Sequence, residues 1–249
     1  MTTVRQAVLA LARRAGLETT LRRAQRAVEP AAVRRNRRDD ENLRVVMAAV
    51  LERDSCCVDV GANVGTVLAD MVAIAPDGSH IAYEPLPELS ESLARRFPQV
   101  DVRAAALSDH AGEATFTRVR SAPSRSGFRP IGGRRGRTEQ LTVPVERLDD
   151  ALPDGFVPAL IKIDVEGAEE QVLRGALETI RRHRPVVVLE HGNSAAEYGT
   201  RADDVFELLC GMAGLRIFDM DGAGPLTLER FRAVASPPAA TRWNFFARP

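Results

Sequence analysis

Val58-Asp59-Val60-Gly61-Ala62-Asn63-Val64-Gly65 passes from an apolar run directly into two closely spaced glycines. Glycine adopts backbone conformations that are closed to other residues, so Gly61 and Gly65 predict a tight turn between a short buried strand and a following helix. The first N–H groups of such a helix have no partners within the helix and are available to a ligand. The pattern therefore predicts a turn that binds a small molecule.

The residue types in this turn indicate the charge of the ligand. A dinucleotide-binding turn reads G-x-G-x-x-G, whereas Asn63 occupies the middle position here. Asp59 stands just before the turn, where its negative charge would repel a pyrophosphate and attract a cation. S-adenosylmethionine (SAM) carries a sulfonium and an ammonium group and fits this requirement. The expected cofactor-binding residues of the turn are Asp59, Gly61, Asn63 and Gly65.

Length and composition limit the class of protein. The chain has 249 residues, 45% of them hydrophobic, which suits one α/β domain with an extension. Its formal net charge is zero, so no overall field attracts nucleic acid or an anionic membrane. Three cysteines cannot form a disulfide framework, no apolar run is long enough to span a bilayer, and the N-terminus lacks the apolar core of a secretion signal. We expect a soluble, cytoplasmic protein.

The chain divides into an extension and a principal domain. Residues 1–40 are arginine-rich with apolar positions at helical spacing, and they predict a helical extension. Solvated helix faces explain these arginines most simply, but contact with a partner subunit in a homodimer is the alternative. A second helix is predicted from Asp39 or Asp40 to Leu51, and residues 41–249 form the expected principal domain.

From Cys56 onward, short apolar strands alternate with amphipathic helices, a pattern typical of parallel strands joined by crossover helices. The predicted strands are 56–60, 80–84, 100–106, 159–164, 185–190 and 215–219, with a closing strand over the aromatic residues of 243–248. The predicted helices are 65–75, 86–97, 167–183 and 202–213. Residues 118–140 contain seven arginines and four glycines and predict a mobile basic loop. We hypothesise that it closes over an acceptor carrying phosphate or carboxylate, and solvent-exposed disorder is the alternative.

Ionisable residues follow several of the predicted strands. The C-terminal ends of parallel strands converge on one edge of a sheet, where ligands bind. Glu84 ends the second strand about 20 residues beyond the glycine turn, a spacing at which a carboxylate accepts the hydroxyl hydrogens of a ribose. Ser108 and Asp109 follow the third strand. Asp109 either accepts from an adenine amino group or forms an ordinary turn.

Several blocks of the sequence together resemble a known family. They are Asp59–Gly65, Tyr83–Pro87, Leu107–Asp109, Arg184–Pro185 with Leu189–Glu190, and above all Ile161-Lys-Ile-Asp-Val-Glu-Gly-Ala-Glu169. Over roughly residues 56–192 the chain is similar to the FkbM-type SAM-dependent methyltransferases. The resemblance implies an α/β class I methyltransferase (Rossmann-like) fold, with helices on both faces of a mostly parallel seven-stranded sheet whose last strand is antiparallel. It also implies methyl transfer, usually to a hydroxyl oxygen of a natural product, sugar or lipid.

Methyl transfer to a hydroxyl needs a group that takes its proton. His191 follows the fifth strand and, with an intrinsic pKa of about 6.5, is the first candidate base, although it could instead cap the turn before Gly192. Asp164 and Glu166 are the next candidates, and Lys162, the only lysine, could pair with one of them. Asp164, Glu166, Glu190 and His191 could also ligate a divalent metal. No closely spaced histidine pair or cysteine set accompanies them, and we predict no metal site.

Other functions are kept as alternatives. An N-methyltransferase acting on a small molecule would need less help from a base, because a neutral amine attacks through its lone pair. A non-catalytic nucleotide-binding module would bind SAM without turnover. A dinucleotide oxidoreductase is disfavoured by Asn63 and Asp59, and a nucleic-acid acceptor is disfavoured because no aromatic platform lies in a basic setting. We expect a small-molecule acceptor.

Overall fold

The computed structural model describes residues 30–119, 126–128, 138–192, 194–236 and 241–249. The chain divides into two compact units, Met1–Leu43 and Arg44–Pro249. Helix α3 spans Ala31–Val50 and begins well before Asp39, where the sequence predicted its start. The segment contains no proline or glycine, and ion pairs one turn apart stabilise it, Arg35–Asp39 at 3.0 Å and Arg37–Glu41 at 3.1 Å.

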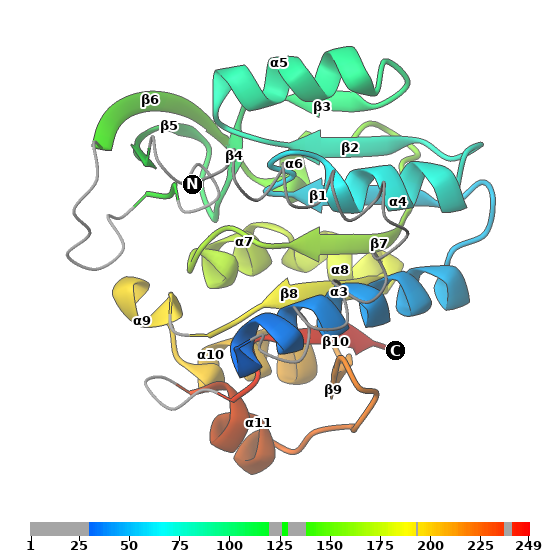
Figure 1. Ribbon diagram of the computed structural model, residues 1–249, viewed down its shortest axis with the longest axis vertical. Helices are drawn as coiled ribbons and strands as arrows, with labels where there is room; N and C mark the ends of the chain where they lie inside the picture. Colours follow the sequence, from blue (N-terminus) through cyan, green and yellow to red (C-terminus); the bar gives the residue numbers. More distant parts are fainter. Residues whose placement is uncertain (1–29, 120–125, 129–137, 193, 237–240) are drawn as a thin grey trace, which may run out of the picture. The chain divides into compact units, whose positions relative to one another are not determined.

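The second unit is built on a seven-stranded sheet in the order β3-β2-β1-β7-β8-β10-β9 (Figure 1). Strand β10 pairs antiparallel with both β8 and β9, and the remaining pairs are parallel. The predicted mostly parallel sheet with an antiparallel last strand is confirmed. Its strands are β1 Cys56–Val60, β2 His80–Tyr83, β3 Asp101–Arg103, β7 Pro158–Ile163, β8 Val186–Glu190, β9 Arg216–Asp219 and β10 Asn244–Arg248.

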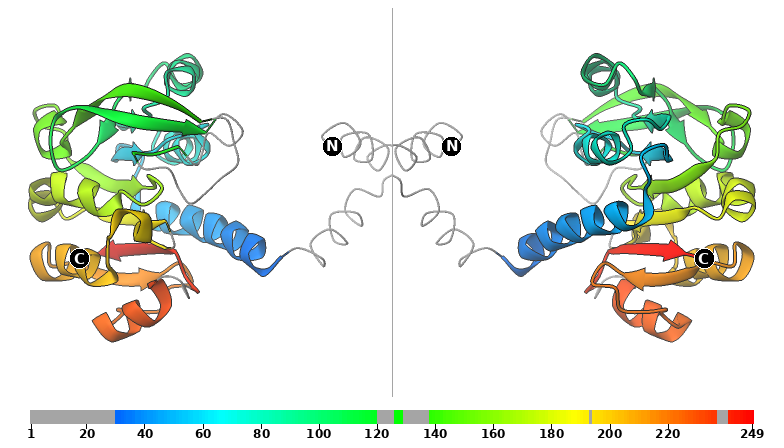
Figure 2. Two further views of the ribbon diagram at one scale, coloured as in Figure 1. Left: turned by 90° about the vertical axis from the view of Figure 1, so that its left-hand side faces the viewer. Right: turned by 90° about the vertical axis from the view of Figure 1, so that its right-hand side faces the viewer.

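Helices cover both faces of this sheet. Helix α4 (Thr66–Ile74) lies in front of the sheet in Figure 1, whereas α7 (Glu169–Gly175) and α8 (Leu177–His183) lie behind it, and the edge-on views of Figure 2 agree. The other helices are α5 Pro87–Arg96, α6 Leu148–Ala151, α9 Ala195–Tyr198, α10 Ala202–Phe206 with the π-helix η2 Glu207–Met212, and α11 Leu228–Ala235. The strands bury apolar side chains against the helices because both of their faces are covered.

Two predicted elements are interrupted. The single helix predicted over 167–183 breaks at Ala176, whose φ of −115° and ψ of 4° are not helical. Gly175 precedes the break and packs against Ser108, where a Cβ would collide with the backbone carbonyl oxygen. The strand predicted over 100–106 also divides. The chain leaves the main sheet after Arg103 and enters a second sheet at Ala106.

The second sheet was not predicted as a unit. It has three strands in the order β4-β6-β5, namely β4 Ala106–Leu107, β6 Thr138–Glu146 and β5 Gly112–Val119. The two long strands pair antiparallel from Gly112↔Val145 to Val119↔Thr138. Both ends of the loop predicted over 118–140 are therefore strand. Residues 120–125 and 129–137, which include most of its arginines, lie outside the described residues.

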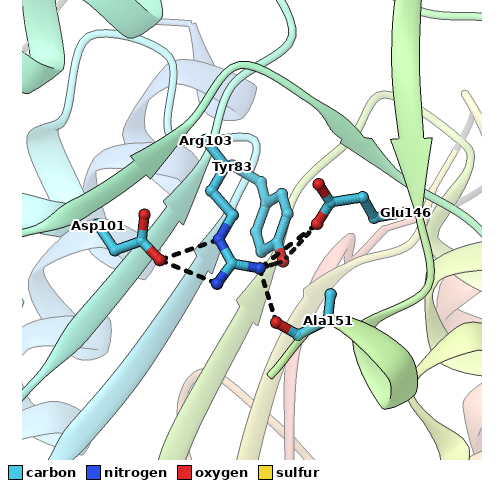
Figure 3. Close-up of polar contacts among 5 residues, drawn as sticks. All are labelled: Tyr83, Asp101, Arg103, Glu146 and Ala151. Atoms are coloured by element: carbon cyan, nitrogen blue, oxygen red, sulfur yellow. Dashed lines mark hydrogen bonds and ion pairs between the residues drawn. The ribbon is translucent and has the colours of Figure 1, made fainter. Parts of the chain in front are cut away.

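A polar network joins the second sheet to the main one (Figure 3). Arg103 at the end of β3 donates to the Tyr83 hydroxyl at 2.7 Å and to the Ala151 carbonyl oxygen at 2.8 Å. The Tyr83 hydroxyl in turn donates to Glu146 Oε2 at 3.1 Å, and Asp101 pairs with Arg103 at 2.9 Å. This network holds the end of β6 beside the C-terminal end of β2.

Candidate active site

A pocket lies where the C-terminal ends of β1, β2, β7 and β8 meet the second sheet. Figure 1 shows the β5–β6 hairpin at the same edge toward which these strands point. The main sheet contributes polar side chains and the glycine turn, and the second sheet contributes aromatic ones. The lining includes Gly61, Asn63, Glu84, Asp164, Glu166 and Glu190 from the main-sheet side, and Phe116, Ser126 and Phe128 from the hairpin side.

The glycine turn adopts the tight geometry that the sequence predicted. Gly61, Asn63 and Gly65 have positive φ angles of 77°, 50° and 76°. The Tyr83 carbonyl oxygen accepts from the N–H of Gly61 at 3.0 Å, and a Cβ at Gly61 would collide with the backbone oxygen of Asp164. The turn therefore packs between the ends of β2 and β7. Position 61 requires glycine because its φ is positive and because there is no space for a Cβ.

Glu84 is held across this turn by backbone hydrogen bonds. Its Oε2 accepts from the Asn63 N–H at 2.9 Å and its Oε1 accepts from the Leu86 N–H at 2.9 Å. Burial raises the pKa of Glu84, while these hydrogen bonds oppose the increase. Each carboxylate oxygen has a second lone pair, so Glu84 can still accept from hydroxyl groups of a ligand.

Asp59 lies behind the pocket, not on its surface. Its side chain is fully buried, and its Oδ1 lies 3.3 Å from Lys162 Nζ, which also lies 3.4 Å from Asp164 Oδ2 and donates to the Gly61 carbonyl oxygen at 3.1 Å. Burial raises the pKa of Asp59, and Lys162 opposes that shift. Burial alone would lower the pKa of Lys162, but the two aspartates raise it. Asp59 and Lys162 thus stabilise the turn from inside, and the charge facing a ligand comes from other carboxylates.

The turn after β7 presents two of those carboxylates. Asp164 and Glu166 both line the pocket, and Glu166 has an unusual φ of 57°. The buried Glu169 holds this conformation, because its Oε1 accepts from the N–H groups of Val165 at 3.1 Å and Gly167 at 3.0 Å. Burial raises the pKa of Glu169 to about 7. The sequence analysis did not assign a role to Glu169, although it closes the Ile161–Glu169 motif.

Glu190 lies in the pocket, although it was not among the predicted catalytic or cofactor-binding residues. It ends β8, lines the pocket and is partly buried. Burial, followed by the charges of Asp164, Glu169 and Glu166, raises the pKa of Glu190 to about 9. The sequence did indicate Glu190, because it is an acid at the end of a strand. His191 was predicted to be the base in its place because the intrinsic pKa of histidine is nearer neutrality.

His191 does not reach the pocket. Its ring is fully buried, stacks on Phe231 with the centroids 5.9 Å apart, and makes no hydrogen bond within the described part of the chain. Burial lowers the pKa of His191 to about 4. Strand β8 ends at Glu190, as predicted, but the residue that follows it packs away from the pocket. Its neutral ring belongs to the apolar layer beside α11, and this position does not support the predicted role as general base.

Three more predicted cofactor residues lie outside the pocket lining. Ser108 is buried and donates to Asp109 Oδ1 at 3.2 Å, and the same oxygen lies 2.9 Å from His110 Nδ1. Asp109 therefore forms the local polar turn that was its alternative role. A Cβ at Gly65 would meet Leu93 and Phe97, so this glycine permits packing of the turn on α5.

Among the described residues, no group of three histidine, cysteine, aspartate or glutamate side chains is arranged to hold a metal ion. None of the described helices combines the length and apolar character needed to cross a membrane.

Comparison with known proteins identifies the family. Residues 59–214 match the model of the methyltransferase FkbM domain. A crystal structure of methyltransferase FkbM from Methylobacillus flagellatus matches with a TM-score of 0.51 at 17% identity, covering 79% of this chain and 44% of that chain. AMB antimetabolite synthetase AmbE of Pseudomonas aeruginosa is 28% identical in an alignment 200 positions long, which covers 64% of this chain and only 9% of AmbE. The chain belongs to the family of FkbM-domain methyltransferases, and its fold is the class I fold of SAM-dependent methyltransferases.

Proposed function

We propose that this protein transfers a methyl group from SAM to a hydroxyl oxygen of a small organic acceptor. The observation that carries the proposal is the charge of the pocket. Its described lining contains the carboxylates of Glu84, Asp164, Glu166 and Glu190 and no lysine or arginine. Such a lining attracts a cation, and the sulfonium and ammonium groups of SAM are cationic. The residues present therefore fit this cofactor.

The cofactor side of the pocket is assigned to the turn after β1 and the end of β2. Glu84 is fixed by two backbone N–H groups and would accept the hydroxyl hydrogens of the ribose. The apolar side chains of Leu86 and Leu107 line the same pocket and suit the adenine ring. We assign to them the contact with adenine, for which Asp109 was one candidate in the sequence.

The acceptor side is assigned to the space between the second sheet and the tips of β7 and β8. Phe116 and Phe128 pack edge-to-face with centroids 5.6 Å apart and give the pocket an apolar wall. The tips of β7 and β8 line the same pocket with Asp164, Glu166 and Glu190. An acceptor with an apolar portion and a hydroxyl group suits this combination of side chains. The arginines invoked for an anionic acceptor lie mostly outside the described residues, and the described lining offers that acceptor no positive charge.

When bound, SAM supplies an electrophilic methyl group on a positively charged sulfur. The chain has to orient the acceptor hydroxyl and take its proton. Carboxylates at the tips of β7 and β8 lie in the pocket and can accept that proton, whereas His191 does not line it. We therefore assign proton acceptance to these carboxylates.

The cofactor half is tested by titration calorimetry with SAM and with its demethylated product, S-adenosylhomocysteine. Replacing Glu84 with Gln removes the negative charge that accepts the ribose hydroxyls, and we expect both dissociation constants to rise roughly tenfold. Glu91→Gln is the matched control, because Glu91 is exposed on α5 and pairs only weakly with Arg95 at 3.6 Å. Absence of binding of both ligands to the wild-type protein would refute the proposed function.

An amine acceptor is the second candidate, and the same carboxylates favour it because they would bind an ammonium group. The two acceptor types differ in the product. Incubation with methyl-labelled SAM and a panel of alcohols and amines, followed by mass spectrometry and NMR, locates the new methyl group on oxygen or on nitrogen. Methylation of amines alone would replace the first candidate with the second.

A further inference from the structure

Two carboxyl groups lie side by side at the pocket edge of the main sheet. Strands β7 and β8 pair in parallel through Ile163↔Leu189, so the next residues along the two strands, Asp164 and Glu190, are neighbours. Both line the pocket, and the negative charge of Asp164 helps to raise the pKa of Glu190. Two carboxylates at such close range cannot both ionise without a large electrostatic cost, so a proton between them is stabilised.

The surroundings of Glu190 add negative charge. The charges of Glu166, in the turn after β7, and of Glu169, at the start of α7, raise the pKa of Glu190 together with that of Asp164. On the other side, β10 places Asn244, which is uncharged, in register with Glu190.

The positive charge of Lys162 lies next to Asp164 and Asp59. Its Nζ lies 3.4 Å from Asp164 Oδ2 and 3.3 Å from Asp59 Oδ1. Within the pair, Lys162 therefore favours negative charge on Asp164, which places the shared proton on Glu190. Burial and the three neighbouring carboxylates raise the pKa of Glu190 to about 9, in agreement with this placement.

We propose that Glu190 holds a proton against Asp164 in the ligand-free pocket, releases it when the positive charge of SAM enters, and then takes the proton of the acceptor hydroxyl. This inference rests on the proposed function, because it requires SAM in the pocket. A cation among these carboxylates offsets their mutual repulsion and so favours the ionised form of Glu190. Cofactor binding thereby generates the base that the reaction needs.

Every proton that is taken up or released in one catalytic cycle is accounted for. Methyl transfer to a hydroxyl forms an O–C bond and breaks the C–S bond, whose electron pair stays on sulfur, and it sets free the hydroxyl proton. The ionised Glu190 takes that proton. Once the positive charge on sulfur is lost, the neighbouring carboxylates again favour the protonated form, and Glu190 keeps the proton until the next SAM binds. The solvent thus receives one proton per turnover, at the step of cofactor binding.

Calorimetry distinguishes this mechanism without any acceptor. Binding of SAM and of S-adenosylhomocysteine is measured at pH 7.5 in phosphate and in Tris, whose ionisation enthalpies differ, so that the buffer dependence of the heat counts the protons released. We expect SAM to release about one proton more per site than S-adenosylhomocysteine. The two ligands share the same amino-acid end and adenosine, so protons released by those parts cancel in the difference.

Variants locate the proton. Glu190→Gln should abolish the excess proton release with SAM while binding S-adenosylhomocysteine within about threefold of wild type, a change of under 1 kcal/mol. Glu178→Gln, at an exposed position on α8, should keep the excess release. Equal proton release by the two ligands in the wild-type protein, or an unchanged excess in Glu190→Gln, would overturn the inference. The proposed function itself would survive either result and would fail only if neither ligand binds.

Discussion

At the scale of single residues, Glu190 and Lys162 show opposite consequences of burying charge. Glu190 lies among carboxylates, and ionising it is unfavourable. Lys162 lies between two aspartates and is stabilised as a cation. The repulsion around Glu190 would be offset by a cationic ligand in the pocket. The attraction between Lys162 and its two aspartates stabilises the fold without any ligand.

Glu190 should make the stability of the ligand-free protein depend on pH. Its pKa is raised in the folded state from 4.5 to about 9. The folded state therefore binds more protons than the unfolded state between these values, and its stability falls as the pH rises through this range. Glu190→Gln removes the effect. We expect the variant to have a higher Tm than wild type, with a larger difference at pH 9 than at pH 5. The difference should grow by about 2–4 °C for each 1 kcal/mol of unfolding free energy that the wild type loses through ionisation of Glu190.

Differential scanning fluorimetry of both proteins without ligand checks this prediction. Asp59 also has a raised pKa, but it is present in both proteins and is not among the charges that raise the pKa of Glu190, so its contribution cancels in the comparison. A gain in Tm that is the same at the two pH values would mean that Glu190 ionises as freely in the folded chain as in the unfolded one.

Loss of Lys162 should be severe. Lys162→Met leaves the fully buried Asp59 without its cation, and we expect the free energy of unfolding to fall by about 3–5 kcal/mol in urea titrations at pH 7. Arg53→Met, which breaks the exposed Arg53–Asp77 pair, serves as the control and should cost less than about 1 kcal/mol. Similar losses in the two variants would contradict a structural role for the buried pair.

At the scale of elements, the pocket depends on two turns that support each other. The glycine turn after β1 packs against the backbone of Asp164, and the turn after β7 is held by Glu169. Both use left-handed backbone conformations, which cost energy outside glycine and persist only when surrounding contacts require them. Displacing either turn would move the carboxylates of the other.

Glu169 offers a test of this coupling. Glu169→Ala leaves the N–H groups of Val165 and Gly167 without their acceptor, and we expect a loss of about 2–3 kcal/mol in stability together with weaker binding of S-adenosylhomocysteine. Glu169→Gln keeps an acceptor oxygen and should recover most of both losses. If Gln is as damaging as Ala in calorimetry and urea unfolding, the two hydrogen bonds are not what holds the turn.

At the scale of the whole second unit, the pocket exists because two sheets meet. The main sheet supplies the acidic tips of its parallel strands, and the second sheet supplies the wall that contains Phe116. The network around Arg103 and Tyr83 joins the sheets at their junction (Figure 3). An acidic face and an apolar face therefore enclose one space, although they come from separate sheets.

Local sequence patterns were sufficient to predict the order and type of the helices and strands of the main sheet. Short apolar runs alternating with amphipathic helices have one stable arrangement, because strands buried on both faces need helices on each side. The glycine turn and Glu84 were also predictable, since a positive φ and a carboxylate at a strand end are properties of single residues at fixed spacing. The second sheet gave no such signal. Its strands β5 and β6 are half exposed and pair across a long separation in sequence.

The choice between neighbours at a strand tip depended on packing across the whole unit. Successive side chains at the end of a strand point in opposite directions, so Glu190 and His191 could not both enter the pocket. Glu190 enters the pocket because of the parallel register of β8 on β7. His191 does not, because it stacks on Phe231 of α11. Spacing along the chain sets which residues reach the edge of the sheet. Contacts between distant segments set which of them face the ligand, because burial and neighbouring charges are properties of the assembled fold.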